Sequence, residues 1–275
     1  MSASTAPLVP RAEWDPGFVA GHPAHAVLAR AAACFASATE WPAPSTWRGA
    51  LETAGLADAL LTESGVPIRF VDAPPKTKSR RRRAPVDVAT IYDERIYARG
   101  EVPSRQASWH DFLNMLVWAT FPAAKSALNA RQRAALRAHI VDGAERLPGS
   151  RTREQDALAM LDEGGILVLA ETRALVQVGH AVESANANAL AERVRVGDAV
   201  VLAFGHALHE HLLSTDTEVR ALALVLAVPA IPAAVHARVA LADAHLHAAL
   251  AGGEILKAPS GSPAMPVLGA LFPAS

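Results

Sequence analysis

Residues 108–129 read SWHDFLNMLVWATFPAAKSALN and place several polar side chains inside an otherwise apolar stretch. These side chains belong to His110, Asp111, Asn114, Lys125 and Asn129. A polar group costs free energy to bury unless a partner satisfies it. The stretch therefore indicates a functional site, although a purely structural hydrogen-bond network would satisfy the same groups.

Two helices joined by a sharp corner are predicted for this stretch. Ser108 is a good N-cap for a helix over residues 109–120, because its hydroxyl can accept a bond from a free N–H of the first turn. Pro122 suits the start of a second helix, which we expect to end near Gly143. Residues three or four apart share a helix face. The polar residues of both helices are therefore expected to converge inside the corner.

The rest of the chain predicts an α+β fold, mainly helical, in a single domain. Alternating and branched residues predict strands at 66–71, 88–97, 157–161 and 166–169, the last two joined as a hairpin, and a further buried strand at 222–228. Helices are expected over residues 24–38, 172–193, 199–213 and 240–251. We expect the sheet to be small and mostly antiparallel. The domain would span residues 22–275, after a loosely ordered segment at 1–21.

A second polar group lies in residues 199–213, which read AVVLAFGHALHEHLL. His206 and Glu210 would be one helical turn apart, on one face of a helix. An imidazole and a carboxylate so placed can share a divalent metal, whose identity the sequence leaves open. The pair does not form an HExxH motif, and an isolated pair of this kind is also common as a structural brace. We predict a metal site at these two residues.

The predicted packing would bring His110, His206 and Glu210 to one place. A histidine beside a carboxylate can act as a general base, and a lysine can hold an anionic group. We therefore assign catalysis to the five polar residues of the opening stretch. A helix N-terminus would favour the neutral form of His110, which is the form that acts as a base or a metal ligand.

Substrate binding is assigned to Arg105 and Tyr92, which precede the first helix. The planar fork of an arginine suits a carboxylate or a phosphate, but Arg105 could instead pair with Asp111. Asp162 and Glu163 are interpreted mainly as turn residues at a hairpin tip. The favoured function is a hydrolase-like or metal-dependent enzyme acting on a small anionic substrate. The alternative is a binding or scaffold protein whose polar cluster is structural.

The overall charge gives no signal for nucleic acid or an anionic membrane, because 26 Lys and Arg nearly balance 27 Asp and Glu. The one charge run, KTKSRRRR at residues 76–83, is expected to lie in an exposed loop over 74–85. We interpret this run as a solvated linker. Association with nucleic acid through it is the less favoured alternative.

The compartment is expected to be the cytoplasm. Cys34 is the only cysteine, which favours a reducing environment. The first residues lack the apolar core of a secretory signal. The longest apolar run, at 221–235, is too short for a membrane span and contains Pro229 and Pro232. We therefore expect a soluble protein with no membrane partner.

Several motifs together resemble one bacterial family. They are ESGVPIRFV at 63–71, YDERI at 92–96, WHDFLNMLVW at 109–118, FP at 121–122, Lys125, LN at 128–129, DALAMLDEGGILVL at 156–169 and FGHALHEHLL at 204–213. The chain is similar through them to the family known as domain of unknown function 3025. The resemblance covers about residues 42–269. It implies no particular activity, so the site assignments rest on the residues themselves.

Overall fold

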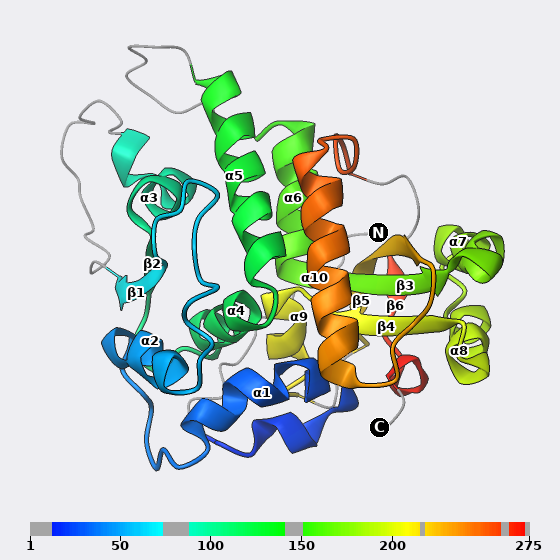
Figure 1. Cartoon of the computed structure of the whole chain (residues 1–275), viewed down its shortest axis with the longest axis horizontal. Coiled ribbons are helices and arrows are strands. Elements are labelled where there is room, and N and C mark those ends of the chain that lie inside the picture. Colours follow the sequence, from blue (N-terminus) through cyan, green and yellow to red (C-terminus); the bar gives the residue numbers. More distant parts are fainter. Residues whose placement is uncertain (1–12, 74–87, 141–150, 215–217, 260–263, 273–275) are drawn as a thin grey trace.

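The computed structural model describes residues 13–73, 88–140, 151–214, 218–259 and 264–272. The basic run at 76–83, for which we predicted an exposed loop, lies outside these ranges. The fold is α+β and mainly helical, as predicted. Figure 1 shows the helices gathered around a small sheet, with a second, two-stranded sheet at the opposite side of the molecule.

The chain order of the elements sets the frame for the site. The strands are β1 (Arg69–Asp72), β2 (Glu101–Ser104), β3 (Gly165–Glu171), β4 (Ala199–Ala203), β5 (Arg220–Val228) and β6 (Met265–Pro266). The α-helices are α1 (Ala29–Ala32), α2 (Pro44–Thr53), α3 (Tyr92–Arg99), α4 (Trp109–Thr120), α5 (Pro122–His139), α6 (Arg153–Gly164), α7 (Leu175–Glu183), α8 (Ala187–Val196), α9 (His206–His211) and α10 (Val235–Ala251). Short 3-10 helices are η1 (Phe18–Gly21), η2 (Pro23–Leu28), η3 (Ala33–Phe35), η4 (Val88–Thr90), η5 (Thr172–Ala174) and η6 (Gly269–Leu271).

The larger sheet has the strand order β4-β3-β5-β6 and mixes both pairing directions. β3 pairs with β5 in parallel and with β4 in antiparallel fashion. In the smaller sheet β1 and β2 are parallel. The prediction of a mostly antiparallel sheet is therefore only partly right. The parallel pair β3–β5 requires a long crossover, which the helices α7 and α8 and the strand β4 provide.

The larger sheet separates two hydrophobic clusters. Its central strand β3 is buried on both faces, so it is a continuous apolar run rather than an alternating one. Leu167 and Leu169 face the cluster that includes α4, α5, α6 and α10. Ile166 and Val168 face the cluster that includes α7 and α8. In Figure 1, α5, α6 and α10 stand side by side next to the sheet, and α7 and α8 lie at its far end.

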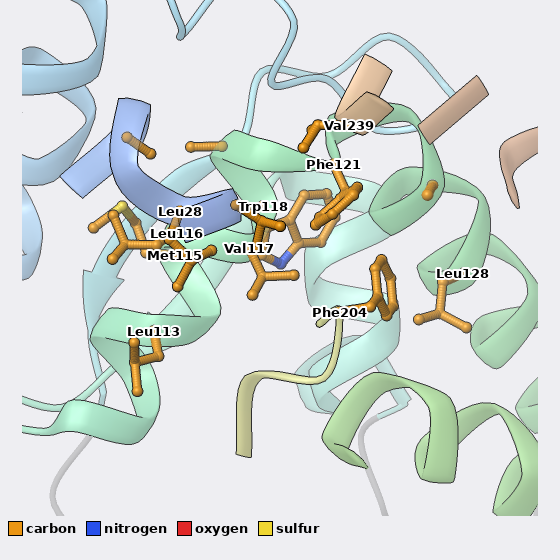
Figure 2. Close-up of a cluster of buried hydrophobic side chains, with 14 of the residues drawn as sticks. Leu28, Leu113, Met115, Leu116, Val117, Trp118, Phe121, Leu128, Phe204 and Val239 are labelled. Atoms are coloured by element: carbon orange, nitrogen blue, oxygen red, sulfur yellow. The ribbon is translucent and has the colours of Figure 1, made fainter. Parts of the chain in front are cut away.

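The predicted corner between two helices is present, and it organises the larger cluster. Ser108 caps α4, its hydroxyl accepting a bond of 3.4 Å from the Asp111 amide. α5 begins at Pro122 as predicted. Figure 2 shows Trp118 and Phe121 from the corner packed toward Phe204 and Val239, which come from distant parts of the chain. The Phe121 and Phe204 rings lie 5.3 Å apart, edge to face. The corner therefore joins α4 and α5 to the segments that precede α9 and form α10.

The strand predicted at 88–97 is wrong, because these residues form η4 and most of α3. Asp93 and Glu94 occupy the first turn of α3, where acidic groups stabilise the positive end of the helix dipole. Gly100 ends the helix at a φ of 66°, the left-handed conformation typical of such ends. Alternation over so few residues fits a helix with one buried face as well as a strand.

The hairpin predicted around residues 162–165 is also wrong. Residues 157–161 belong to α6, which begins with a capping box in which Thr152 and Gln155 exchange side-chain bonds to each other's backbone amides. Leu158 and Leu161 are buried at the three-residue spacing of a helix. Residues 162–164 are therefore the last turn of α6, and β3 starts directly after them.

The single helix predicted over residues 199–213 is divided in two. The branched residues of 199–203 form the edge strand β4, and α9 starts only at His206. Likewise, the helix predicted over 172–193 is divided into η5, α7 and α8. The 24–38 segment alternates between 3-10 and α turns. Tertiary packing and local turns decided these boundaries, which local periodicity does not specify.

The described part of the N-terminal segment packs on the first helix of the corner. The Trp14 ring stacks on Trp109 with centroids 5.4 Å apart, and Phe18 meets both Trp109 and Phe112 edge to face. Phe18 is buried.

Among the described residues, the structure contains no helix with the length and apolar character needed to cross a bilayer.

Gly205 provides the first test of this arrangement. A Cβ at this position would lie 2.5 Å from the Glu163 carbonyl oxygen and 2.5 Å from the Gly165 amide nitrogen. We expect Gly205→Ala to lower the free energy of unfolding by about 1–3 kcal/mol, because backbone must move to admit the methyl group. Chemical denaturation measures the change.

The matched control is Gly179→Ala in α7, where an added Cβ meets no atom within 4 Å. Alanine is the better helix former, so this variant should be as stable as the parent or more so. Equal stability of the two variants would contradict the close approach at Gly205.

Candidate functional site

Three elements converge where the two predicted polar segments meet. His110 lies in the first turn of α4, His206 is the first residue of α9, and Glu163 lies in the last turn of α6. His206 is buried, His110 is partly buried and Glu163 is exposed. The close contact of Gly205 with the end of α6 brings His206 beside Glu163. The two motifs around residues 110 and 206 therefore form one site.

The side chains of His110, His206 and Glu163 form a group that could hold a metal ion, because one ligand atom from each lies within 4.8 Å of the others. The Nε2 atoms of the two histidines are 3.1 Å apart. Glu163 Oε2 is 3.5 Å from His206 Nε2. Ligands about 2.0–2.1 Å from a tetrahedral zinc ion are about 3.3 Å from each other. The observed distance between the two Nε2 atoms is slightly shorter than this value, and the distance from Glu163 Oε2 to His206 Nε2 is slightly longer.

Each histidine has a carboxylate on its other ring nitrogen. His110 Nδ1 is 2.9 Å from Glu210 Oε2. His206 Nδ1 is 3.9 Å from Asp162 Oδ1, and this buried nitrogen makes no hydrogen bond. A carboxylate bonded to Nδ1 favours the tautomer in which Nδ1 carries the hydrogen and Nε2 offers its lone pair. The bond to Glu210 therefore favours a free Nε2 lone pair on neutral His110, whereas Asp162 lies near His206 Nδ1 without a hydrogen bond to it.

Glu210 is thus placed behind His110, outside the group that could hold a metal. We predicted Glu210 as a ligand together with His206 because the two are one helical turn apart. In the structure, however, α9 directs Glu210 to the far nitrogen of His110. His110, which comes from α4, therefore lies next to His206 where we predicted Glu210.

The two histidines differ in their affinity for a proton. Burial lowers the pKa of His206 to about 3, so the ring is neutral at neutral pH. The hydrogen bond to Glu210 raises the pKa of His110. Our expectation that the helix N-terminus would favour the neutral form of His110 is therefore wrong, because the hydrogen bond to Glu210 outweighs the opposing effect of burial and the net shift of the pKa is upward. Burial also raises the pKa of Glu163.

A buried ion pair adjoins this group. Lys125 of α5 is buried and donates to Asp162, the residue before Glu163, and to Asn114 Oδ1 at 3.0 Å. Asn114 in turn donates to the Tyr92 hydroxyl at 3.2 Å. Burial alone would raise the pKa of Asp162, but Lys125 and His206 outweigh it and the net shift is downward. Asp162 is therefore an anion held between a cation and the His206 ring.

Arg105 and Asp111 are paired with each other at the edge of the site. The guanidinium donates to both carboxylate oxygens at 2.7 and 2.9 Å, and the Arg105 amide donates to Oδ2 at 2.6 Å. The fork is thus already engaged by a protein carboxylate, as in the second of our two interpretations. The Arg105 side chain is 53% exposed.

Asn129 lies one helical turn beyond Lys125 and is buried. Its side-chain amide donates to the Asp93 carbonyl at 3.2 Å. This bond ties α5 to the first turn of α3, near Tyr92. The structure therefore brings Asn129 to the far end of the polar network, where its side-chain amide bonds to backbone rather than to the histidine pair.

Sequence reasoning gave too little weight to Asp162 and Glu163. Our prediction of a strand before them makes both residues part of a turn, whereas the structure places them in the last turn of α6. The capping box at Thr152 and Gln155 is the signal that could have identified α6. A helix that starts there and runs twelve residues has both acidic residues in its last turn. In the structure the Asp162 side chain is 15% exposed and that of Glu163 is 53% exposed.

The buried ion pair allows a stability prediction. We expect Lys125→Met to lower the free energy of unfolding by about 3–5 kcal/mol, because Asp162 would keep its charge without its main partner. Lys257→Met is the control, since Lys257 is exposed and pairs with Glu254 at the surface; that change should cost less than about 1 kcal/mol.

Adding Asp162→Asn to Lys125→Met should restore part of the lost stability, because the unpaired charge is removed. Urea denaturation of the single and double variants measures both effects. A Lys125→Met variant as stable as the control would show that the ion pair does not hold α5 against α6.

Comparison with known proteins agrees with the resemblance in the motifs. No curated protein and no solved structure matches the chain. The family model described as "Protein of unknown function (DUF3025)" matches residues 80–271, which is more than half of the chain and includes every residue of the site. The chain therefore belongs to the DUF3025 family.

Proposed function

We propose that the protein is a metal-dependent enzyme of hydrolytic type, with a divalent metal held by His110, His206 and Glu163. The observation that carries the proposal is the position of the two Nε2 atoms, 3.1 Å apart. Each ring also has a carboxylate near its Nδ1 atom. Histidine ligands of metals commonly have such carboxylate partners.

The donor set favours zinc or a similar transition metal. Two imidazoles and one carboxylate are the ligands of several catalytic zinc sites, in which the fourth position takes water or substrate. A bound ion of this kind lowers the pKa of its water and polarises a carbonyl or phosphoryl oxygen. The exposure of Glu163 supports an open side of the site, because its side chain is 53% exposed whereas that of His206 is only 5% exposed.

The surrounding residues orient these ligands. Glu210 holds the His110 ring by its Nδ1 atom, and Asp162 is placed to do the same for His206. Lys125 in turn donates a bond to Asp162 and keeps that carboxylate in place. Asn114 accepts a second bond from Lys125 and so acts on Asp162 only through the lysine. We assign these residues positioning roles. This differs from our assignment of catalysis to Asn114 and Lys125. In the part of the chain that the structure describes, both side chains bond to residues of the polar network rather than to a group on the open side of the site.

A small anionic substrate remains part of the proposal, with a changed mode of binding. Lys125 and Arg105, which we expected to hold the anion, both already pair with carboxylates. A substrate carboxylate or phosphate would therefore bind the metal itself, and Arg105 and Tyr92 would border it. Several carboxylates lie at this site and would repel an anionic substrate. A bound metal cation would offset their charge and allow the substrate to bind.

The competing explanation is a structural network without a metal. It is favoured by the two hydrogen bonds that Lys125 donates to Asp162 and Asn114. In such a network protonated His110 would donate through Nε2 to His206. This leaves Glu163 without a hydrogen-bond donor among the described residues, and it gives no role to its position near the two rings. Metal binding distinguishes the two explanations.

Metal binding is tested directly with Co²⁺ and Zn²⁺ on protein first treated with a chelator. We expect one equivalent to bind, with a visible Co²⁺ spectrum typical of low coordination number and a rise in melting temperature that a chelator reverses. Glu163→Gln should weaken the binding by at least about tenfold, and His110→Asn should abolish it. Glu183→Gln, an exposed residue at the end of α7, is the matched control.

The same melts report on the structural explanation. If His110 only braces the fold, His110→Asn should lose about 1–3 kcal/mol of stability, because Glu210 and His206 lose a partner. A large loss of stability in this variant, with neither protein responding to metal or chelator, would overturn the proposal.

The second test concerns Glu210 and catalysis together. Loss of a carboxylate behind a histidine ligand typically costs about 10–100-fold in metal affinity or activity. We expect Glu210→Leu to show a loss of this size, in Zn²⁺ affinity and in hydrolysis of nitrophenyl ester or phosphate substrates. Glu210→Gln should fall between this variant and the parent, because its amide oxygen can still accept from His110 Nδ1.

Such a graded series would not follow from a general loss of stability, which circular dichroism and melting temperature would detect. If Glu210→Leu binds Zn²⁺ as tightly as the parent, Glu210 does not position a metal ligand. If the parent binds Zn²⁺ but hydrolyses neither substrate class, the metal site stands and the hydrolytic assignment fails.

A further inference from the structure

A second concave site lies apart from the histidine pair. It is a groove with a volume of about 480 Å³ between the N-terminal helical segment, the corner between α4 and α5, and α10. None of the residues that form the candidate metal site lines it. Small-molecule sites in proteins usually have volumes of about 300–1,000 Å³. The groove is therefore large enough for a ligand of its own.

The walls of the groove are apolar and consist largely of small side chains. One wall is the face of α10 that carries Val235, Val239 and Ala240. Val27 and Leu56 contribute from the opposite side. Val239 also packs toward Trp118 and Phe121, as Figure 2 shows, so this wall rests on the core rather than on a mobile loop. A groove of this kind suits a flexible apolar chain better than a large rigid ring system.

Among the described residues, no side chain bonds to the guanidinium of an arginine that lines the groove. Arg30, at the second position of α1, lines the groove and is exposed. Its guanidinium forms no hydrogen bond and no ion pair within the part of the chain that the structure describes. Other arginines near the polar sites, such as Arg105 and Arg133, are engaged with carboxylates. A free guanidinium can bind a carboxylate through two parallel hydrogen bonds.

The acidic residue of the groove does not compete for this cation. Both oxygens of Asp243 accept bonds from the first turn of α5, at 2.7 Å from the Ala124 amide and 3.2 Å from the Ala123 amide. The positive end of the α5 dipole offsets its charge. Asp243 therefore serves as a cap for α5, and its described bonds are to these backbone amides rather than to Arg30, which lines the same groove.

We propose that this groove binds a free long-chain carboxylic acid. The apolar chain would lie along the α10 wall, and the carboxylate would bind the Arg30 guanidinium. An isolated guanidinium beside an alanine-rich groove matches a molecule with one anionic end and an otherwise apolar body. This site is independent of the proposed metal centre, because the two share no residue.

A displacement assay tests the proposal on the full chain. A fluorescent polyene fatty acid serves as the probe, and hexadecanoic acid and hexadecanol serve as competitors. We expect hexadecanoic acid to displace the probe at low micromolar or lower concentration. Arg30→Ala should weaken the acid by about tenfold, the usual effect of losing a hydrogen bond to a charged group. It should leave hexadecanol unchanged, because the alcohol has no charge for Arg30 to bind.

Two matched variants control for the surface and the apolar wall. Arg99→Ala removes an exposed arginine at the end of α3, outside the groove, and should not alter binding. Ala240→Trp should block both competitors by filling the groove, whereas Ala244→Trp, an exposed position one turn further on α10, should bind both normally. Circular dichroism confirms that each variant is folded.

Several results would overturn the inference. One is a failure of the parent protein to bind the probe. Another is a loss of binding that is the same for acid and alcohol in Arg30→Ala, since the arginine would then not act through the carboxylate. Sedimentation with phosphatidylglycerol vesicles in the absence of free-acid binding would instead identify a membrane surface as the ligand. Each of these results is obtained without any metal, so it is separate from the test of the histidine site.

Discussion

The ion pair between Lys125 and Asp162 is the interaction on which the site depends. Lys125 approaches from α5 and Asp162 from the last turn of α6, and both are removed from solvent to a large degree. Two charges lose their hydration in such a place, so the pair forms only if its geometry is good and its other bonds are satisfied. Asn114 of α4 supplies one of those bonds. Three helices are thereby fixed relative to one another around a single buried cation.

The fixed position of Asp162 determines what lies next to it. The following residue, Glu163, emerges at the protein surface, while Asp162 remains inside beside the His206 ring. The close approach of Gly205 to the same turn of α6 brings α9 into contact with it. Stability and site geometry are therefore coupled here. A change that loosens the pair would also change the distance between Glu163 and the two histidines.

Sequence reasoning predicted some of the elements around the candidate site to the residue and missed the ends of others. The helix over residues 109–120 could be predicted to the residue, because Ser108, Pro122 and a strong apolar pattern specify its ends locally. The end of α6 could not, since Gly164-Gly165 predicts a turn, whereas in the structure the helix ends at Gly164 and the strand starts directly at Gly165. The meeting of His110 with His206 rests on contacts between segments about a hundred residues apart. Local patterns carry no information on such contacts, and burial of polar side chains was the only indication that a partner exists.

The orientation of the two histidines follows from which nitrogen each carboxylate occupies. If Glu210 bound His110 through Nε2, the remaining nitrogen would face α4 rather than His206. Because it binds Nδ1 instead, Nε2 is directed to the space that His206 also faces. The contact of 3.1 Å between the two Nε2 atoms needs a hydrogen or a cation between them, because two bare lone pairs repel each other. Without a metal, either ring can supply that hydrogen, since neutral His206 can carry its one hydrogen on Nε2. On our proposal a metal ion takes the place of this hydrogen and binds the lone pairs of both Nε2 atoms.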